Sequence, residues 1–386
     1  MPATIVLSLN SGSSSLKFAL FEVSEGDPHR MYAGAVEGIG AASSHFWVRV
    51  SDGHTLQENH SPVPDQDSAL RTVARLVIDG HLPSPQAIGH RVVHGGPNLR
   101  EHQRITPEVL RELENISVLA PLHVPIQLRL IRLTESHFPA VPQFACFDTA
   151  FHRTLSEQAS RFALPDQFWT AGVRRYGFHG LSCESILHAL APNVPPRLII
   201  AHLGSGASIT AVLNGASVDN TMGLTPTGGI VMGTRPGDLD PGVFLYLLRT
   251  TQVQADSLEQ LLDRQSGLLG ISGFSSDMKQ LRASSDPRAR MAIDIFCRSV
   301  KKAMGAFVSI LGGLDELIFA GGVGENDAAS RREICRGLEP LGISLDEQKN
   351  EDNLTLISGV GSLVRVRIQH SDEEIQIARQ TARLLA

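Results

Sequence analysis

A strand–turn–strand unit that occurs twice is the sequence feature that most constrains the fold. Residues 4–9 and 16–23 have strand character, and the NSGSSS stretch between them has the composition of a tight turn. The segment LIIAHLGSGASITAVLNG repeats this plan in the second half of the chain. Ser11 and Ser205, which begin the two aligned turns, are 194 residues apart in a chain of 386. Half a chain separates the two units, which predicts that one type of domain has been duplicated.

The remaining pattern indicates an α/β protein. At 386 residues the chain exceeds the size at which a single core stops growing, so we expect two domains. Strands and helices alternate along the chain, as in α/β folds. The expected helices are 66–79, one that starts at Thr106-Pro107, 291–311 and 373–384, and the expected strands are 141–147, 197–202 and 316–320, the last running into a glycine turn.

Composition argues against several classes of function. A formal net charge of −6 gives no electrostatic attraction to nucleic acid or to an anionic membrane, so we expect neither partner. No apolar run has the length needed to span a bilayer, and the start MPATIVLSLN lacks the features of a signal peptide. The four cysteines are scattered and form no CxxC pair, which predicts neither a disulfide framework nor a zinc knuckle. A cytoplasmic location is the simplest expectation.

Three segments rich in glycine and small residues are candidates for binding phosphates: NSGSSSLKF, HLGSGAS and AGGVGEND. Backbone N–H groups reach a phosphate only where side chains are small, although a tight hairpin uses the same residues. Neither GxxxxGK[ST] nor GxGxxG is present, which disfavours a P-loop or Rossmann site. Hairpins that hold phosphates from two related domains resemble the sugar-kinase and actin-like ATPase superfamily. Lys17 could reach a phosphate, and Asn10 could hold a phosphate oxygen or a metal-bound water; either could also be an ordinary strand or turn residue.

Charged side chains in four further motifs could surround a phosphoryl group in transfer. Arg91 lies in GHRVVHGG, Arg235 in GTRPGDLDP, His179 in RRYGFHG and Asp148 in FDTAFH. Each alone could be structural, but together they supply two guanidinium groups, an imidazole and a carboxylate, all expected in loops at strand ends. Such donors stabilise the equatorial oxygens of a phosphoryl group.

Six histidines also raise the possibility of a catalytic zinc site. None of the six forms an HExxH motif or an HxH pair with a carboxylate at ligand spacing, so we expect no catalytic zinc. They are His90, His94, His123, His152, His179 and His202.

Taken in order, these motifs make the chain similar to the acetate kinase (acetokinase) family from Leu7 to about Ala378. The motifs are NSGSSSLKF, GHRVVHGG, FDTAFH, RRYGFHG, HLGSGAS, TMGLTP, MGTRPGDLDP, SSDMK, GGVGEN and DEEIQIA. The resemblance implies two duplicated actin-like (ribonuclease H-like) domains with an interdomain nucleotide cleft. Residues 1–147 and 369–386 would form the first domain. Residues 148–368 would form the second, with most of the nucleotide site and the dimer interface of a homodimer.

The resemblance also implies an activity and its residues. ATP would phosphorylate acetate reversibly, by direct in-line transfer, with Mg²⁺ or Mn²⁺ bound by Asn10 and by Glu373 or Glu374. The implied catalytic residues are Asp148, His179, Arg235 and Arg91. The implied substrate residues are Arg91, Val93, Leu122, Phe178 and Pro226. The implied residues for ATP or ADP are Lys17, His202, Leu203, Gly204, Ser205, Gly206, Asp277, Met278, Lys279, Gly322, Val323, Gly324, Glu325 and Asn326.

Three departures from the family pattern bear on the substrate and nucleotide sites. Val124 replaces the asparagine of a PLHNP motif, Thr227-Gly228 replaces Leu-Glu in TPLEG, and Lys279 replaces an arginine. The first affects the loop around His123, the second could reshape the acid pocket, and the third exchanges a planar contact for a point charge.

Alternative functions remain at this stage. A kinase for propionate or butyrate has the same motifs, because one methylene changes discrimination by only about 1–3 kcal/mol. A nucleotide-switched binding protein on an actin-like fold is a third possibility. For a kinase, a short acid is already ionised at neutral pH, so we expect Asp148 to position Arg91 or the metal shell instead of abstracting a proton. We also expect Arg91, Arg235 and His179 to converge on one spot.

Overall fold

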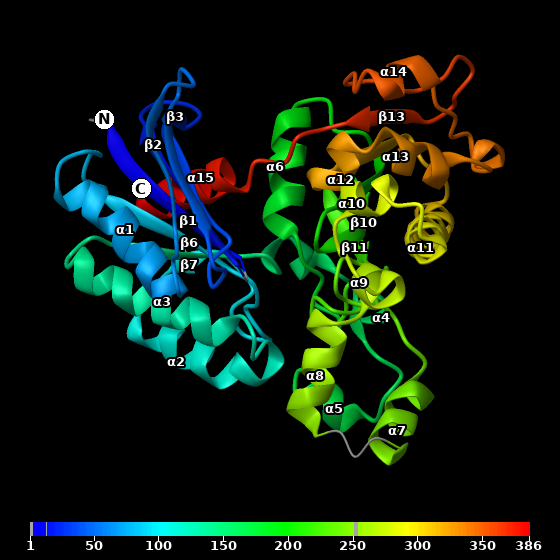
Figure 1. Ribbon diagram of the computed structural model, residues 1–386, viewed down its shortest axis with the longest axis horizontal. Coiled ribbons are helices and arrows are strands. Elements are labelled where there is room, and N and C mark those ends of the chain that lie inside the picture. Colours follow the sequence, from blue (N-terminus) through cyan, green and yellow to red (C-terminus); the bar gives the residue numbers. More distant parts are fainter. Residues whose placement is uncertain (1–2, 13, 251–253) are drawn as a thin grey trace. The chain divides into compact units, whose positions relative to one another are not determined.

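The N-terminal hairpin lies inside a mixed eight-stranded sheet (Figure 1). The computed structural model describes residues 3–12, 14–250 and 254–386, so Ser13 in the first predicted turn lies outside the described residues. The strand order is β5-β4-β3-β2-β1-β6-β8-β7. The strands are β1 (Thr4–Ser11), β2 (Ser15–Val23), β3 (His29–Glu37), β4 (Ser44–Val50), β5 (Thr55–Ser61), β6 (Ala87–Val92), β7 (Gln103–Arg104) and β8 (Gln143–Phe147).

Helices cover both faces of this sheet. Alternate residues of β1 point to opposite faces, as a strand requires. Leu7 and Leu9 belong to the core on the side of α1, whereas Val6 packs in a cluster with Ala378 of α15. The helices of this unit are α1 (Gln66–Ile78), α2 (Pro107–Asn115), α3 (Val124–His137) and α15 (Glu373–Leu385), with a 3-10 turn at Ile116–Leu119.

A five-stranded sheet forms the second unit, in the order β11-β10-β9-β12-β13. The strands are β9 (Arg197–Leu203), β10 (Ala207–Leu213), β11 (Ala216–Asn220), β12 (Glu316–Ala320) and β13 (Arg365–Ile368). Helix α11 (Pro287–Leu311) packs on β9 and β10. The other helices are α4 (Glu157–Ser160), α5 (Asp166–Thr170), α7 (Pro241–Thr250), α8 (Ala255–Arg264), α9 (Gly267–Ser272), α10 (Met278–Ala283), α12 (Gly321–Asn326), α13 (Ala328–Cys335) and α14 (Glu347–Glu351), with 3-10 turns at Ala150–Thr154 and Glu339–Leu341. Helix α6 (Gly180–Leu190) contributes to both units.

The two sheets share one topology. In the first, β3-β2-β1 are antiparallel neighbours, and β6 and β8 then add in parallel to β1. In the second, β11-β10-β9 are antiparallel, and β12 and β13 add in parallel in the same way. The duplication predicted from the 194-residue repeat is therefore confirmed at the level of strand pairing, with β4, β5 and β7 as additions to the first unit.

Most predicted elements are confirmed, and three details are corrected. Helix α2 starts where Thr106 caps it and Pro107 follows, as expected. Helix α11 begins at Pro287, before the predicted residue 291, because Asp286 caps its N-terminus. The GGVGEN segment is a short helix instead of an open turn. Arg91 lies within β6 and not in a loop, because the parallel pairing with β8 continues through it.

Residue contacts divide the chain into two compact units. The first consists of Met1–Ala150, Gly180–Ser185 and Asp372–Ala386, and the second of Phe151–His179 and Ile186–Ser371. The C-terminal helix thus belongs with the N-terminal sheet. The domain limits given by the resemblance, 147/148 and 368/369, stay a prediction. Across the described ranges, no helix has both the length and the apolar character needed to cross a bilayer.

Gly89 in β6 sets how closely α15 approaches the sheet. A Cβ at this position would meet Thr381 Oγ1 and lie 2.5 Å from Ile377 Cγ2. We expect Gly89→Ala to lower the free energy of unfolding by roughly 1–3 kcal/mol, as overpacking does. Urea unfolding measures it. The matched control is Gly305→Ala in α11, where a Cβ meets no atom within 4 Å and alanine should stabilise by about 0.5–1 kcal/mol. Equal stability of the two variants would contradict this packing.

Candidate active site

Arg91 and Asp148 form an ion pair in the first unit. β6 and β8 are parallel neighbours, with Arg91 opposite Cys146, so the residue that follows β8 lies close to Arg91. Arg91 Nε donates to Asp148 Oδ1 at 3.1 Å and Oδ2 at 3.0 Å, and Nη2 donates to Oδ2 at 2.6 Å. Asp148 is 1% exposed, and its backbone N–H donates to the Val92 carbonyl. Such a charge-assisted fork holds the guanidinium in one orientation.

Asn10 links this pair to the start of the C-terminal helix. Its Oδ1 accepts from Arg91 Nη1 at 3.1 Å. Its Nδ2 donates at 2.9 Å both to Glu373 Oε2 and to Glu374 Oε1. Lys17 is exposed and stands directly opposite Asn10 across the β1–β2 pair, so both side chains lie on the same face. The structure therefore places together every predicted catalytic and metal residue that belongs to the first unit.

Charges in this cluster shift the pKa values of both members of the pair. Burial raises the pKa of Asp148 to about 6, and the attraction and hydrogen bonds of Arg91 oppose this rise. Burial alone would lower the pKa of Arg91, but Asp148 and Glu373 outweigh it and hold that pKa above its usual range. At pH 7 the pair is therefore ionised, and a second anion near Arg91 would meet a permanent positive charge.

The donor set beside Asn10 fits a magnesium ion. Mg²⁺ prefers oxygen ligands and is usually bound by one or two carboxylates together with waters and substrate phosphates. Glu373 and Glu374 supply two carboxylates in the first turn of α15, and Glu373 Oε2 is 3.8 Å from Arg91 Nη1. Since both carboxylates contact the same Asn10 amide, either could ligate the ion.

His179 occupies a strained position in the second unit. Its φ of +59° lies in the left-handed region, where a residue with a Cβ is uncommon. Its Nδ1 hydrogen-bonds Ser208 Oγ at 2.9 Å, and its ring stacks on His202 with centroids 4.3 Å apart. Ser208 is buried in β10 and was missed by the sequence analysis; its place two residues after Gly206 in HLGSGAS was the available signal. These contacts fix the orientation of the imidazole, as expected of a group at a functional site.

Arg235 lies beside the same glycine turn as His179. A Cβ on Gly206 would lie 3.4 Å from His179 Nε2 and 3.5 Å from Arg235 Nη1, so a side chain there would crowd both groups. Arg235 Nη1 donates to the Pro226 carbonyl at 3.1 Å. The backbone of Arg235 packs closely on Gly267 (φ +60°). A Cβ on Gly267 would collide with the backbone N and O atoms of Arg235. Imidazole, guanidinium and glycine backbone thus adjoin one another in this unit.

The second unit also contains a cavity of about 700 Å³, within the range of small-molecule sites. Eight predicted nucleotide residues line it: Gly204, Ser205, Asp277, Met278, Lys279, Gly322, Val323 and Asn326. Five lining residues were not predicted: Leu268, Ser276, Arg282, Phe296 and Asp327. Segments far apart in the sequence therefore meet around one space.

The other predicted nucleotide residues of this unit do not line that cavity. Leu203 and Gly324 are buried in β9 and α12. Glu325 bonds His370 Nδ1 at 2.8 Å through Oε2 and accepts from the Gly321 N–H at 3.0 Å through Oε1. His202 and Gly206 belong to the neighbouring His179 cluster.

The predicted acid-pocket residues divide between the units. In the first, Val93 is buried beyond Arg91, its N–H donates to Gln127 Oε1 at 3.1 Å, and Leu122 is half-buried. In the second, Phe178 is 1% exposed, and Pro226 is the residue whose carbonyl accepts from Arg235.

Comparisons with known proteins identify the family. The profile of the acetokinase family matches residues 5–379. The chain belongs to this family. The acetate kinase of Nitrobacter hamburgensis is 44% identical, the alignment covering 98% of this chain and 96% of that protein. The propionate kinase of Citrobacter rodentium is 38% identical over 98% of this chain and 96% of its own length. A propionate kinase structure from Francisella tularensis has a TM-score of 0.89 at 35% identity, covering 99% of this chain and all of that one.

Membership of the acetokinase family has two direct consequences. The protein is a kinase, a phosphotransferase whose acceptor is a carboxyl group. The predicted fold of two actin-like α/β domains is confirmed.

The departures from the acetokinase pattern have visible contacts. The Thr227 hydroxyl donates to Asp263, and the N–H of Gly229, next to Gly228, donates to Asp238 Oδ1 at 2.7 Å, so the altered loop is held by two acidic residues. Val124 is buried at the start of α3. Lys279 is exposed at the rim of the cavity.

Proposed function

We propose that this kinase transfers the γ-phosphate of ATP to acetate, reversibly and in line, giving acetyl phosphate and ADP. The observation that carries this proposal is the Arg91 guanidinium, held by Asp148 and Asn10 and only partly buried. A fixed guanidinium is the group best suited to orient a small carboxylate, because its planar donors match the two carboxylate oxygens.

Each site residue has a role that follows from its chemistry. Arg91 orients the acid, and Asp148 holds Arg91. No general base is needed, since the acid is ionised at neutral pH. Arg235 and His179 donate to the equatorial oxygens of the phosphoryl group, where positioning and charge stabilisation supply most of the catalysis.

The cavity of the second unit is the proposed nucleotide site. Ser205 and Gly322 would offer backbone N–H groups to phosphates, and Lys279 would add a point charge. Mg²⁺, or Mn²⁺, held by Asn10 with Glu373 or Glu374, would neutralise phosphate charge. Lys17, on the same face as Asn10, would assist.

A homodimer in the cytoplasm completes the proposal. In support, helix α7 exposes Leu245, Tyr246 and Leu248 by 49%, 65% and 45%. Apolar side chains gathered on one exposed helix are typical of a surface that a partner covers.

Propionate is the second candidate substrate, because relatives named propionate kinase align over nearly the whole chain. The test is acyl phosphate formation, trapped as hydroxamate, with the purified protein, ATP, Mg²⁺ and acetate, propionate or butyrate. We expect product with acetate and, at lower kcat/KM, with propionate, the ratio being about 10- to 200-fold per methylene. A higher kcat/KM for propionate would reassign the substrate. Nucleotide binding without any acid-dependent product would favour the nucleotide-switched binding protein.

A further inference from the structure

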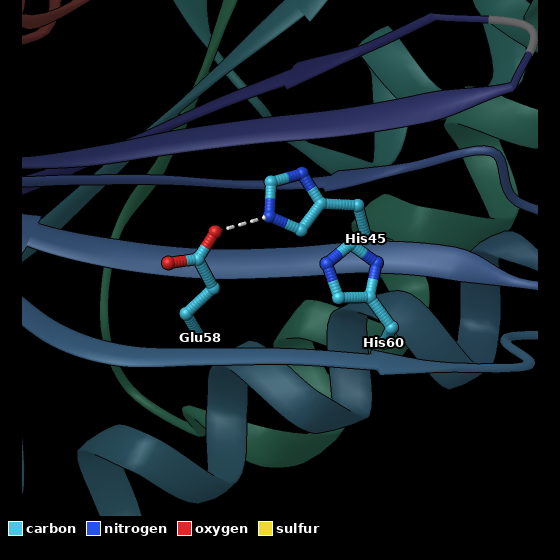
Figure 2. Close-up of side chains that lie close together, drawn as sticks. All are labelled: His45, Glu58 and His60. Carbon is cyan, nitrogen blue, oxygen red and sulfur yellow. Dashed lines mark hydrogen bonds and ion pairs between the residues drawn. The ribbon is translucent and has the colours of Figure 1, made fainter.

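The β4–β5 hairpin carries a cluster of side chains that the kinase chemistry does not use. It lies outside the five-strand plan shared by the two sheets, and β5 is an edge strand whose residues are all exposed. His45, Glu58 and His60 lie together on one face of this hairpin (Figure 2). Among the described residues, no other group of three His, Cys, Asp or Glu side chains has its potential ligand atoms this close together.

Strand pairing explains why these residues meet. His45 and His60 are direct partners across β4 and β5, and Trp47 is the partner of Glu58. Directly opposed residues have Cβ atoms about 4.5–5.5 Å apart, and the diagonal neighbour remains within reach of a long side chain. The sequence conceals the cluster, because a spacing of 15 residues between the histidines acquires meaning only once the register is known.

The distances suit one small cation. His45 Nε2 lies 2.7 Å from Glu58 Oε1, and the two imidazole rings are stacked with centroids 4.5 Å apart. One ligand atom from each residue lies within 4.8 Å of the others. Ligand atoms around one tetrahedral zinc ion, bound at about 2.0–2.1 Å, are about 3.3–3.4 Å apart. Small side-chain rotations close this difference, and the side chains of His45 and Glu58 are 30% and 43% exposed.

Glu37 adds an outer contact of the kind found at metal sites. It is the partner of His45 on the other side, in β3, and its Oε2 lies 3.5 Å from His45 Nδ1. Histidine ligands commonly have a carboxylate at the second ring nitrogen, which fixes the ring and strengthens the ligand. The opposite nitrogen, Nε2, is the one that faces Glu58. A nearby positive charge, Arg49, is stacked over the Trp47 ring at 4.8 Å.

We propose that His45, Glu58 and His60 form a binding site for a divalent transition-metal ion, zinc in the first place, with water as the fourth ligand. Two imidazoles and one carboxylate suit Zn²⁺, whereas Mg²⁺ takes oxygen ligands, so the site is distinct from the proposed magnesium position at Asn10. The ion links β4 to β5 and so holds the exposed edge strand on the sheet.

Calorimetric titration of the full chain with ZnCl₂, in saturating Mg²⁺, tests the site. We expect the wild type to bind one equivalent of zinc. His45→Ala and His60→Ala should lose this binding or show an affinity at least ~10-fold lower, and Glu37→Gln should lower the affinity by about 10-fold. His54→Ala is the matched control, since it removes an exposed imidazole from the same hairpin outside the cluster. Equal zinc binding by His60→Ala and His54→Ala would overturn the proposal.

Electron paramagnetic resonance with one equivalent of Cu²⁺ gives an independent readout of the ligands. The wild-type spectrum should show coupling to two imidazole nitrogens, and the His60→Ala spectrum to one. Zinc should also slow hydrogen exchange of the β5 amides in the wild type and in His54→Ala, but not in His60→Ala. A copper spectrum that is the same in His60→Ala and the wild type would exclude this ligand set.

Discussion

Replacing Arg235 with alanine is expected to lower kcat for acyl phosphate formation by about 10²- to 10³-fold. Removing one fixed donor from a developing charge typically has an effect of this size. The structure supports a large effect because the guanidinium is held on the Pro226 carbonyl and adjoins His179 across Gly206. Arg235→Lys should retain part of the activity, since it keeps the charge but loses the planar fork.

Steady-state kinetics with varied acid and varied ATP measures the effect. Arg298→Ala is the matched control, because Arg298 is an exposed arginine of the same unit on α11, and its loss should leave kcat within about twofold of wild type. Circular dichroism and the thermal midpoint report whether the fold is intact. A folded Arg235→Ala protein with turnover within a few-fold of wild type would remove Arg235 from the chemistry.

Much of the architecture could be predicted from the sequence because it depends on local patterns. The glycine and serine turns flanked by alternating residues identified both hairpins, and the Thr106-Pro107 and C-terminal patterns located α2 and α15. The 194-residue repeat predicted a common topology, which the sheets confirm.

Pairings between distant segments could not be predicted in this way. Asn10 contacts Glu373 and Glu374 only because α15 returns to the first sheet, and no local pattern contains that information. Ser208 pairs with His202 across β9 and β10, but it becomes a partner of His179 only because the start of α6 returns to that sheet. The resemblance of the motifs predicted which residues belong to the site. The residues that orient them could be found only from the structure.

Asp148→Asn is expected to raise the KM for the acid by about 10- to 100-fold and to change kcat less. Losing a charged hydrogen-bond partner typically costs 1.5–3 kcal/mol, here in the positioning of Arg91. If Asp148 were instead a base that abstracts a proton, its replacement would mainly lower kcat and change the KM less. Asp219→Asn is the control, since Asp219 is a partly buried aspartate in β11 of the second unit and should leave the KM unchanged.

The pH dependence separates these roles further. Burial raises the pKa of Asp148 to about 6, so the carboxyl is protonated below that pH and loses its charge-assisted hold on Arg91. In the wild type, kcat/KM for the acid should therefore fall as the pH drops below about 6, and Asp148→Asn should not show this fall.

The free energy of unfolding should respond to pH with the opposite sign, because between pH 3.8 and about 6 the folded state binds more protons than the unfolded state. Lowering the pH through that window should stabilise the wild type relative to Asp148→Asn by up to about 3 kcal/mol, since each pKa unit corresponds to ~1.4 kcal/mol. Urea unfolding at pH 4, 5 and 6 measures this difference, and a difference that shrinks as the pH falls would contradict the raised pKa.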